Sequence, residues 1–136
     1  MKSLRSDAMR LAVYLVVAGC GHAAPPAPKP AEHPVTAVGD VAGTWRASDE
    51  LDFTYTLTIG ADGAYEQWID RNRIGRCRQK GTLAGTGKAL QLTYQIDDCK
   101  RDDIGTTQPL AIESFTGDAL TIAIAGERRA YRRAAR

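Results

Sequence analysis

The chain has 136 residues, of which 43% are hydrophobic and 25% charged, so its length predicts one globular domain. Its formal net charge is +2, and the surplus lies in the first 19 residues, where Lys2, Arg5 and Arg10 outnumber Asp7. The rest of the chain carries equal numbers of basic and acidic side chains, which excludes a general attraction to nucleic acid.

The opening of the chain is typical of an exported protein. A basic start precedes eight apolar residues, 11–18, and this run is far shorter than the ~20 residues of a membrane-spanning helix. We therefore expect residues 1–19 to be a signal peptide that is removed.

The motif Val17-Ala18-Gly19-Cys20 ends this run and resembles the lipobox of bacterial lipoproteins. The resemblance implies that the Cys20 sulfur carries lipid, with acyl chains such as palmitate, and that Cys20 becomes the first mature residue. It also implies a place in the cell envelope. Gly21 stands where inner-membrane lipoproteins often carry Asp, which favours the outer membrane, facing the periplasm or the cell surface.

Five of the six prolines follow directly, between residues 25 and 34. Such a segment favours extended polyproline II and cannot bury a core. We expect residues 20–39 to be a tether, with the folded domain at 40–136. Recognition of this segment by a partner is the alternative.

From residue 40 onward apolar and polar residues alternate with the period of two that is typical of half-buried strands. The pattern predicts an all-β domain with eight strands, near 43–48, 51–59, 64–71, 76–84, 90–96, 110–116, 120–125 and 128–133. Nearly all connections are short, so neighbours in sequence pair antiparallel. An eight-stranded up-and-down meander avoids exposed edges by closing into a barrel.

Turn residues suggest the register of two hairpins. A three-residue loop at Ala61-Asp62-Gly63 places Ile59 opposite Tyr65 and turns Trp68 outward, whereas a two-residue turn brings Trp68 inward. Both placements stay open. A tight turn at Gly87-Lys88 sets Leu83 opposite Leu92.

Cys77 and Cys99 are the two cysteines left if Cys20 is lipidated, and an even pair in an exported protein predicts a disulfide. The expected register puts Cys77 opposite Asp98, so a bulge or loop near residues 97–98 is needed to bring the two cysteines together. Both histidines precede residue 40, which argues against a metal site and against Ser-His or Cys-His catalysis in the domain. We expect no catalytic residues, no metal and no cofactor.

The domain opens with Gly43-Thr44-Trp45 and closes with the arginine-rich "GERRAYRR". A Gly-x-Trp on the first strand and an arginine on the last resemble the lipocalin-like small barrels. The resemblance implies that Trp45 plugs the narrow end under an arginine, for which Arg128, Arg129 and Arg132 are the candidates. Tyr55, Tyr94 and Trp45 are the expected lining residues of a ligand cavity.

These expectations lead to a non-catalytic, monomeric binding module held at a membrane by its lipid. Its expected ligand is a small apolar molecule. The alternatives are binding of an envelope protein, such as inhibition of a periplasmic protease through residues 31–42, and a purely structural role in the envelope.

Overall fold

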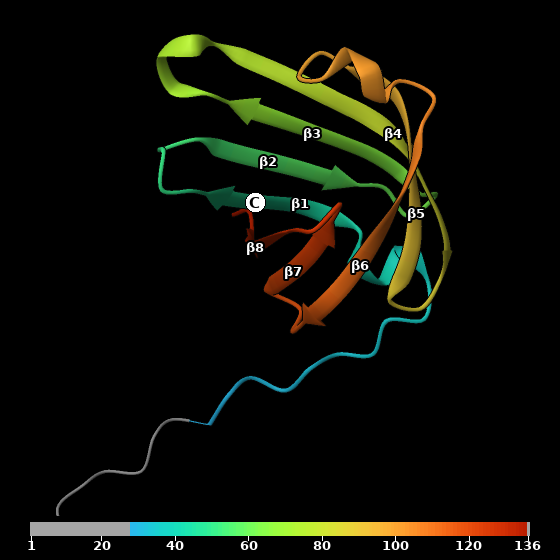
Figure 1. Ribbon diagram of the computed structural model, residues 1–136. Coiled ribbons are helices and arrows are strands. Elements are labelled where there is room, and N and C mark those ends of the chain that lie inside the picture. The colour runs from blue at the N-terminus through green and yellow to red at the C-terminus, as the bar shows by residue number, and fades with distance from the viewer. Residues whose placement is uncertain (1–27, 136) are drawn as a thin grey trace, which may run out of the picture.

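The structure is a computed structural model that describes residues 28–135. These residues form a closed antiparallel barrel in which each strand pairs with its neighbours in sequence and β1 pairs with β8 (Figure 1). The predicted all-β, up-and-down barrel is therefore confirmed. The strands are β1 (Gly43–Ser48), β2 (Thr54–Ile59), β3 (Ala64–Asp70), β4 (Arg76–Thr86), β5 (Ala89–Asp97), β6 (Thr107–Phe115), β7 (Ala119–Ile124) and β8 (Glu127–Arg133).

Period-two alternation builds the core, because alternate side chains of each strand point into the barrel. On β2, for example, Tyr55, Leu57 and Ile59 are buried between more exposed threonines. Within residues 28–135, no helix has the length and hydropathy that crossing a membrane requires. Three short 3-10 helices complete the fold: η1 (Val38–Val41), η2 (Asn72–Ile74) and η3 (Arg101–Asp103).

Both expected hairpin registers are confirmed. Ile59 pairs with Tyr65 and Leu83 with Leu92. The first register turns Trp68 outward, where the guanidinium groups of Arg76 and Arg78 lie 4.5 and 5.4 Å from its ring. The three-residue loop therefore decides the side on which Trp68 lies.

A β-bulge brings the two cysteines together. Gly81 pairs with Tyr94 but Lys80 pairs with Ile96, so Gln95 is an extra residue on β5. The bulge lies at Gln95, closer to the middle of the strand than the expected position near 97–98.

Gly81 makes this bulge feasible, since a Cβ at that position would overlap the carbonyl oxygen of Thr93. The shift aligns Cys77 with Cys99, whose Cα atoms lie 5.3 Å apart in a disulfide. The predicted disulfide is therefore confirmed.

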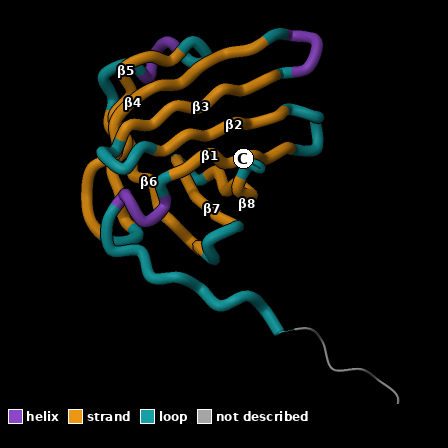
Figure 2. The backbone as a smooth tube through the Cα atoms, turned by 180° about the vertical axis from the view of Figure 1, so that it is seen from behind, coloured by secondary structure: helices purple, strands orange, loops and turns teal. Residues whose placement is uncertain are grey.

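One end of the barrel is closed by the chain that precedes β1 (Figure 2). Val35, Val38 and Val41 are buried in the core, and the backbone N–H of His33 donates to the carbonyl of Phe115 at 2.7 Å. The second half of the expected tether thus packs on the barrel, which extends the folded unit to residues before 40.

Trp45 lies fully buried at this closed end, and its indole N–H donates to the carbonyl of Val41 at 3.0 Å. The guanidinium over its ring, 4.2 Å from the ring centre, belongs to Arg133. That side chain also donates to the carbonyl oxygens of Gly117 at 2.8 Å and Ala42 at 3.2 Å.

The three expected arginines do not cover Trp45. Arg128 pairs with Glu113 on the outside, Arg129 lies over the Tyr55 ring, and Arg132 is exposed. The reason is the register: Trp45 pairs with Arg133, the last residue of β8. The choice of arginine made from the sequence was wrong.

Candidate functional site

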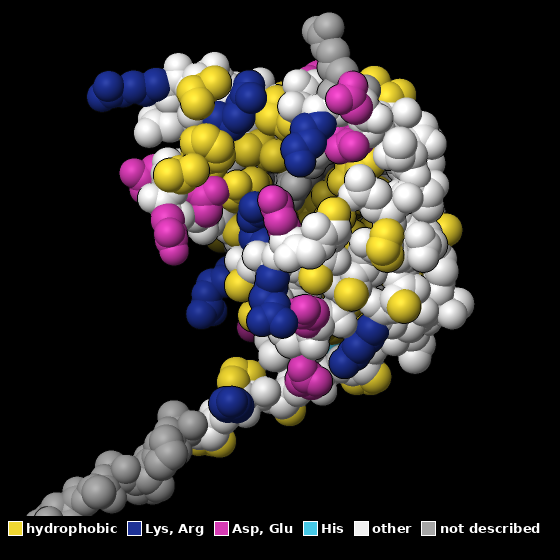
Figure 3. All heavy atoms as spheres, in the orientation of Figure 1, with side chains coloured by type: hydrophobic (Ala, Val, Ile, Leu, Met, Phe, Trp, Pro, Cys, Tyr) yellow, Lys and Arg dark blue, Asp and Glu magenta, His cyan; other side chains and the backbone are white. Residues whose placement is uncertain are grey.

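The opposite, open end of the barrel contains a cavity of about 360 Å³. Figure 3 shows this part of the molecule hollowed, with basic and acidic side chains around the depression. Phe53, Ile69, Ile122 and Ile124 give the cavity an apolar side. A volume of this size lies at the small end of ligand pockets.

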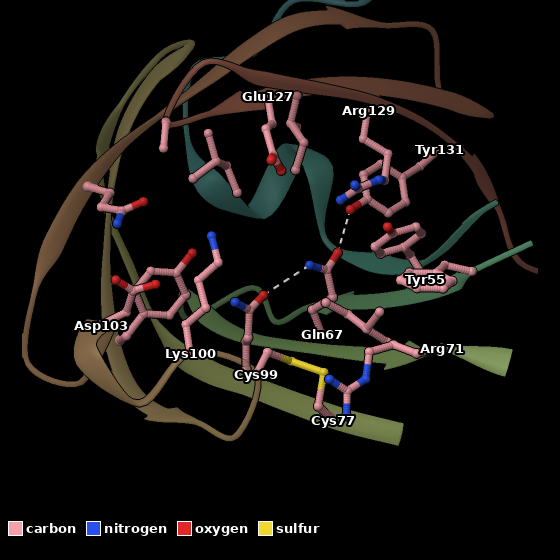
Figure 4. Close-up of a pocket in the computed structure, with 18 residues that line it drawn as sticks. Tyr55, Gln67, Arg71, Cys77, Cys99, Lys100, Asp103, Glu127, Arg129 and Tyr131 are labelled. Carbon is pink, nitrogen blue, oxygen red and sulfur yellow. Dashed lines mark hydrogen bonds between the residues drawn. A yellow bond between two sulfur atoms is a disulfide. The ribbon is translucent and has the colours of Figure 1, made fainter. Parts of the chain in front are cut away.

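Polar side chains line the inner part of the cavity in a connected row. The Tyr131 hydroxyl donates to Gln67 Oε1, Gln67 Nε2 donates to Gln79 Oε1 at 3.3 Å, and Gln79 Nε2 donates to Asp97 Oδ2 at 3.3 Å. Figure 4 shows the first two of these bonds crossing the cavity wall. The second oxygen of Asp97 accepts the backbone N–H groups of Cys99 and Lys100, at 2.9 and 2.7 Å.

The buried side chains of this barrel are mostly hydrophobic, yet the row contains Gln67 and Asp97, which are only 3% and 1% exposed. Buried amides and carboxylates cost free energy unless they are hydrogen-bonded, and here each member has a partner. These hydrogen bonds therefore hold Tyr131, Gln67 and Gln79 in fixed positions in the cavity lining, and Asp97 anchors the end of the row.

Arg129, Tyr55 and Asp49 form a second cluster. The Arg129 guanidinium lies 3.5 Å from the centre of the Tyr55 ring, and the Tyr55 hydroxyl donates to Asp49 Oδ2 at 2.6 Å. Asp49 also accepts the backbone N–H groups of Leu51 and Phe53, at 2.9 and 3.0 Å. The β1–β2 loop thus holds the tyrosine, and the tyrosine ring supports the arginine.

These contacts shift the pKa of both acidic groups in the cluster. Burial and then the hydrogen bond to Asp49 raise the pKa of Tyr55 to about 12. The same hydrogen bond is the main cause that lowers the pKa of Asp49. Tyr55 is therefore neutral and Asp49 charged at neutral pH.

The other wall of the cavity comes from β5 and the loop after it. Lys100, Asp103 and Tyr94 lie there, facing Glu127 and Arg129 from β8 (Figure 4). Burial raises the pKa of the Asp103 carboxyl, and the nearby Asp97 raises it further. Burial likewise raises the pKa of Tyr94 to about 12.

Tyr65 precedes Gln67 by two residues on β3 and is 1% exposed. Its hydroxyl has no hydrogen-bond partner among residues 28–135, and burial raises its pKa well above the ordinary value. The buried phenol therefore stays neutral.

The structure brings together only part of the site expected from the sequence. Tyr55 and Tyr94 line the cavity, whereas Trp45 lies at the other end of the barrel and contributes nothing to it. Cys77 and Cys99 form part of the cavity wall. Cys20 lies outside the described residues.

Gln67, Gln79 and Arg129 were missed as cavity residues. The signal was present in the alternation. Gln67 has the same parity on β3 as the buried Tyr65 and the half-buried Ile69, and Arg129 has the same parity on β8 as the buried Tyr131. A polar residue at an inward position marks a barrel interior that is not filled by apolar packing.

The arrangement is suited to binding a molecule. In the described part of the chain no group of three His, Cys, Asp or Glu side chains is placed to hold a metal ion. His33 packs against the Phe115 ring at the closed end, and the domain from residue 40 has no histidine to act as a base for a nucleophile. The cavity instead presents aromatic rings, amides and charges of both signs around an apolar side.

Comparison with known proteins adds no assignment to this geometry. No protein-family model matches the chain, and neither a curated protein nor a solved structure matches it.

Proposed function

We propose that this protein is a non-catalytic binding module, a lipocalin-like barrel that holds a small molecule in its open end. The observation that carries the proposal is the cavity of about 360 Å³, in which polar side chains with fixed hydrogen bonds face an apolar wall. Ligand sites in proteins combine these two features: apolar surface supplies affinity and a few fixed polar groups supply orientation.

The polar lining changes the expected ligand. Arg129, Lys100, Asp103 and Glu127 all line the cavity, which does not suit a purely apolar molecule. We propose an amphipathic ligand in place of the apolar one that the sequence suggested.

The proposed location rests on the sequence alone. A lipid on Cys20 and a stretch of extended chain before the barrel would hold the cavity near a bacterial membrane surface. Intact mass measurement of the protein from its native envelope tests this: removal of residues 1–19 with a diacylglyceryl mass on Cys20 is expected, and an unmodified Cys20 contradicts it.

Protease inhibition through residues 31–42 receives no support from the fold. Val35 and Val38 of this segment are buried in the barrel's own core, and Thr36 accepts a backbone hydrogen bond from Gly87 at 3.0 Å. These contacts tie part of the segment to its own barrel, which favours the small-molecule proposal over protease inhibition.

The binding function is tested by extracting the purified protein under denaturing conditions and identifying released small molecules by mass spectrometry. Ile124→Trp fills the cavity from β7 and is expected to abolish the released ligand. Ala123→Trp, one residue earlier and on the outer face of the same strand, is the matched control and should retain it. Equal recovery from both variants, or no ligand from the wild-type chain, refutes the proposal.

A further inference from the structure

Arg129 is a half-buried cation in the cavity wall that forms no ion pair with a carboxylate of the described residues. Its guanidinium is half-buried over the Tyr55 ring, yet within residues 28–135 no carboxylate oxygen lies within 4.0 Å of it. The other inward-facing arginine at the end of β8, Arg133, also has no carboxylate of the described chain within 4.0 Å, but its N–H groups donate to two backbone carbonyls. Arg128, its outward neighbour, forms an ion pair with Glu113.

The oxygens of the nearby Asp49 and Asp97 already accept hydrogen bonds. After the hydrogen bond from Tyr55, the charge of Arg129 helps to lower the pKa of Asp49, without an ion pair between them. Asp49 accepts the Tyr55 hydroxyl and two backbone N–H groups, and Asp97 accepts Gln79 and two backbone N–H groups. Glu127 stands at the exposed rim, and Asp103 lies on the opposite wall, where burial raises its pKa.

The arginine is also held in place. One face of the guanidinium is covered by the Tyr55 ring, which is itself fixed by Asp49. Figure 4 shows the remaining edge directed into the cavity, close to the Tyr131 hydroxyl. A planar guanidinium fixed on one face offers parallel N–H donors that match the two oxygens of a carboxylate.

The net charge of the lining has the matching sign. Arg71, Lys100 and Arg129 are basic, and Asp103 and Glu127 are acidic, which leaves one positive charge in excess. Next to Arg129 along the barrel wall, its pairing partner Ile122 begins the apolar side of the cavity. A ligand seated on Arg129 therefore meets hydrocarbon beyond its charged group.

We propose that the cavity binds an amphipathic organic monocarboxylate, with its carboxylate on Arg129 beside Tyr131 and its apolar part against Ile122 and Ile124. The inference rests on the proposed binding function and names the chemical class of its ligand. The proposal places the discrimination on Arg129, because it is the cavity cation held over the Tyr55 ring, so removing its charge should remove selectivity without removing the cavity.

The test compares three eight-carbon probes by calorimetry with the purified full-length chain: octanoate, 1-octanol and octylamine. We expect octanoate to bind at least tenfold more tightly than 1-octanol, and octylamine no better than 1-octanol. Arg129→Met should bring octanoate to the affinity of 1-octanol and leave 1-octanol unchanged. Arg128→Met, the adjacent arginine on the outer face, should behave as wild type.

The outcomes separate the two proposals. Equal binding of octanoate and 1-octanol, or preference for octylamine, overturns the carboxylate assignment while the binding function stands. Absence of binding in all three arms also overturns the assignment, and the binding function then falls only if extraction finds no ligand. Because the comparison of probes uses the wild-type chain, it decides whether the cavity prefers a carboxylate even if Arg129→Met does not fold.

Discussion

Replacement of Arg133 by methionine tests the account of the closed end. Arg133 makes three contacts that methionine cannot reproduce: it lies 4.2 Å from the centre of the Trp45 ring and donates to the carbonyls of Gly117 and Ala42. Methionine keeps an unbranched chain over the indole, so the variant removes the charge and the donors while retaining much of the packing.

The expected loss follows from these contacts. A partly desolvated cation–π contact contributes about 1–2 kcal/mol. Hydrogen bonds from charged donors contribute about 1.5–3 kcal/mol each when both partners are buried. Arg133 is only partly buried, so water can reach the freed carbonyls, and we expect the free energy of unfolding to fall by about 2–4 kcal/mol in total.

Urea denaturation followed by tryptophan fluorescence measures this loss. With a slope of about 1–3 kcal/mol/M for a small protein, the midpoint should fall by on the order of 1–2 M at unchanged slope. Arg132→Met is the matched control, since Arg132 is the exposed neighbour on the outer face, and its effect should stay within about 0.5 kcal/mol. Equal effects of the two substitutions would refute the assignment of Arg133 to Trp45.

Three further predictions concern the bulge, the disulfide and the buried phenols. Replacing both Cys77 and Cys99 by alanine opens a link of sequence separation 22 and should lower the free energy of unfolding by about 3 kcal/mol; an unchanged urea midpoint contradicts this. Gly81→Ala places a methyl group against the Thr93 carbonyl oxygen and should lower the free energy of unfolding by about 2 kcal/mol or more in the same assay. An unchanged urea midpoint would contradict the close approach of the two backbones at the bulge. Burial raises the pKa of Tyr94 to about 12. The stability that the fold gains from keeping this phenol neutral is therefore fully present below pH ~10 and is lost as the pH rises towards 12. Absorbance at alkaline pH should show tyrosinate forming later in the native than in the denatured protein, and coincident titrations would disprove it.

The strands and their order follow from local information in the sequence. Alternation with a period of two identifies half-buried strands, and short glycine-containing loops fix which strands are neighbours and in what register. The pairing of Ile59 with Tyr65 is of this kind, because the loop between them has three residues. In the β4–β5 hairpin the expectation differed from the structure in the position of the bulge, which lies at Gln95 and depends on a close approach of two backbones at Gly81.

The parts that escaped prediction depend on contacts between distant segments. Arg133 meets Trp45 only because the barrel closes with a particular stagger between β1 and β8, and these strands share two residue pairs. Val35 and Val38 belong to a segment whose prolines suggest extended chain, and their burial depends on an end of the barrel that does not exist until all strands have paired. Local patterns in the sequence describe each segment separately, so they do not predict contacts that form only after the barrel has closed.

The candidate site was predicted in outline and missed in its chemistry. Tyr55 and Tyr94 were expected because inward aromatic residues are the usual lining of a small barrel, and both line the cavity. Gln67 was overlooked because a polar residue within a strand is ordinarily assigned to the solvent face, and Arg129 because it was considered only as a candidate to cover Trp45. At both positions the alternation along the strand, which places the residue on the inward face, was a better indicator than the polarity of the side chain.

The two ends of the barrel reach stability by different means, and the difference favours a binding role for the open end. The closed end is filled by apolar side chains under Arg133, as a stable core requires. At the open end a cavity takes the place of that core, and the disulfide between Cys77 and Cys99 joins β4 to the chain after β5 in the cavity wall. A covalent link stabilises the fold without filling space, so the wall keeps its shape while the interior stays accessible. Arg129 has no carboxylate within 4.0 Å among residues 28–135, and under the proposal a ligand carboxylate supplies that partner and stabilises the folded protein by binding to it.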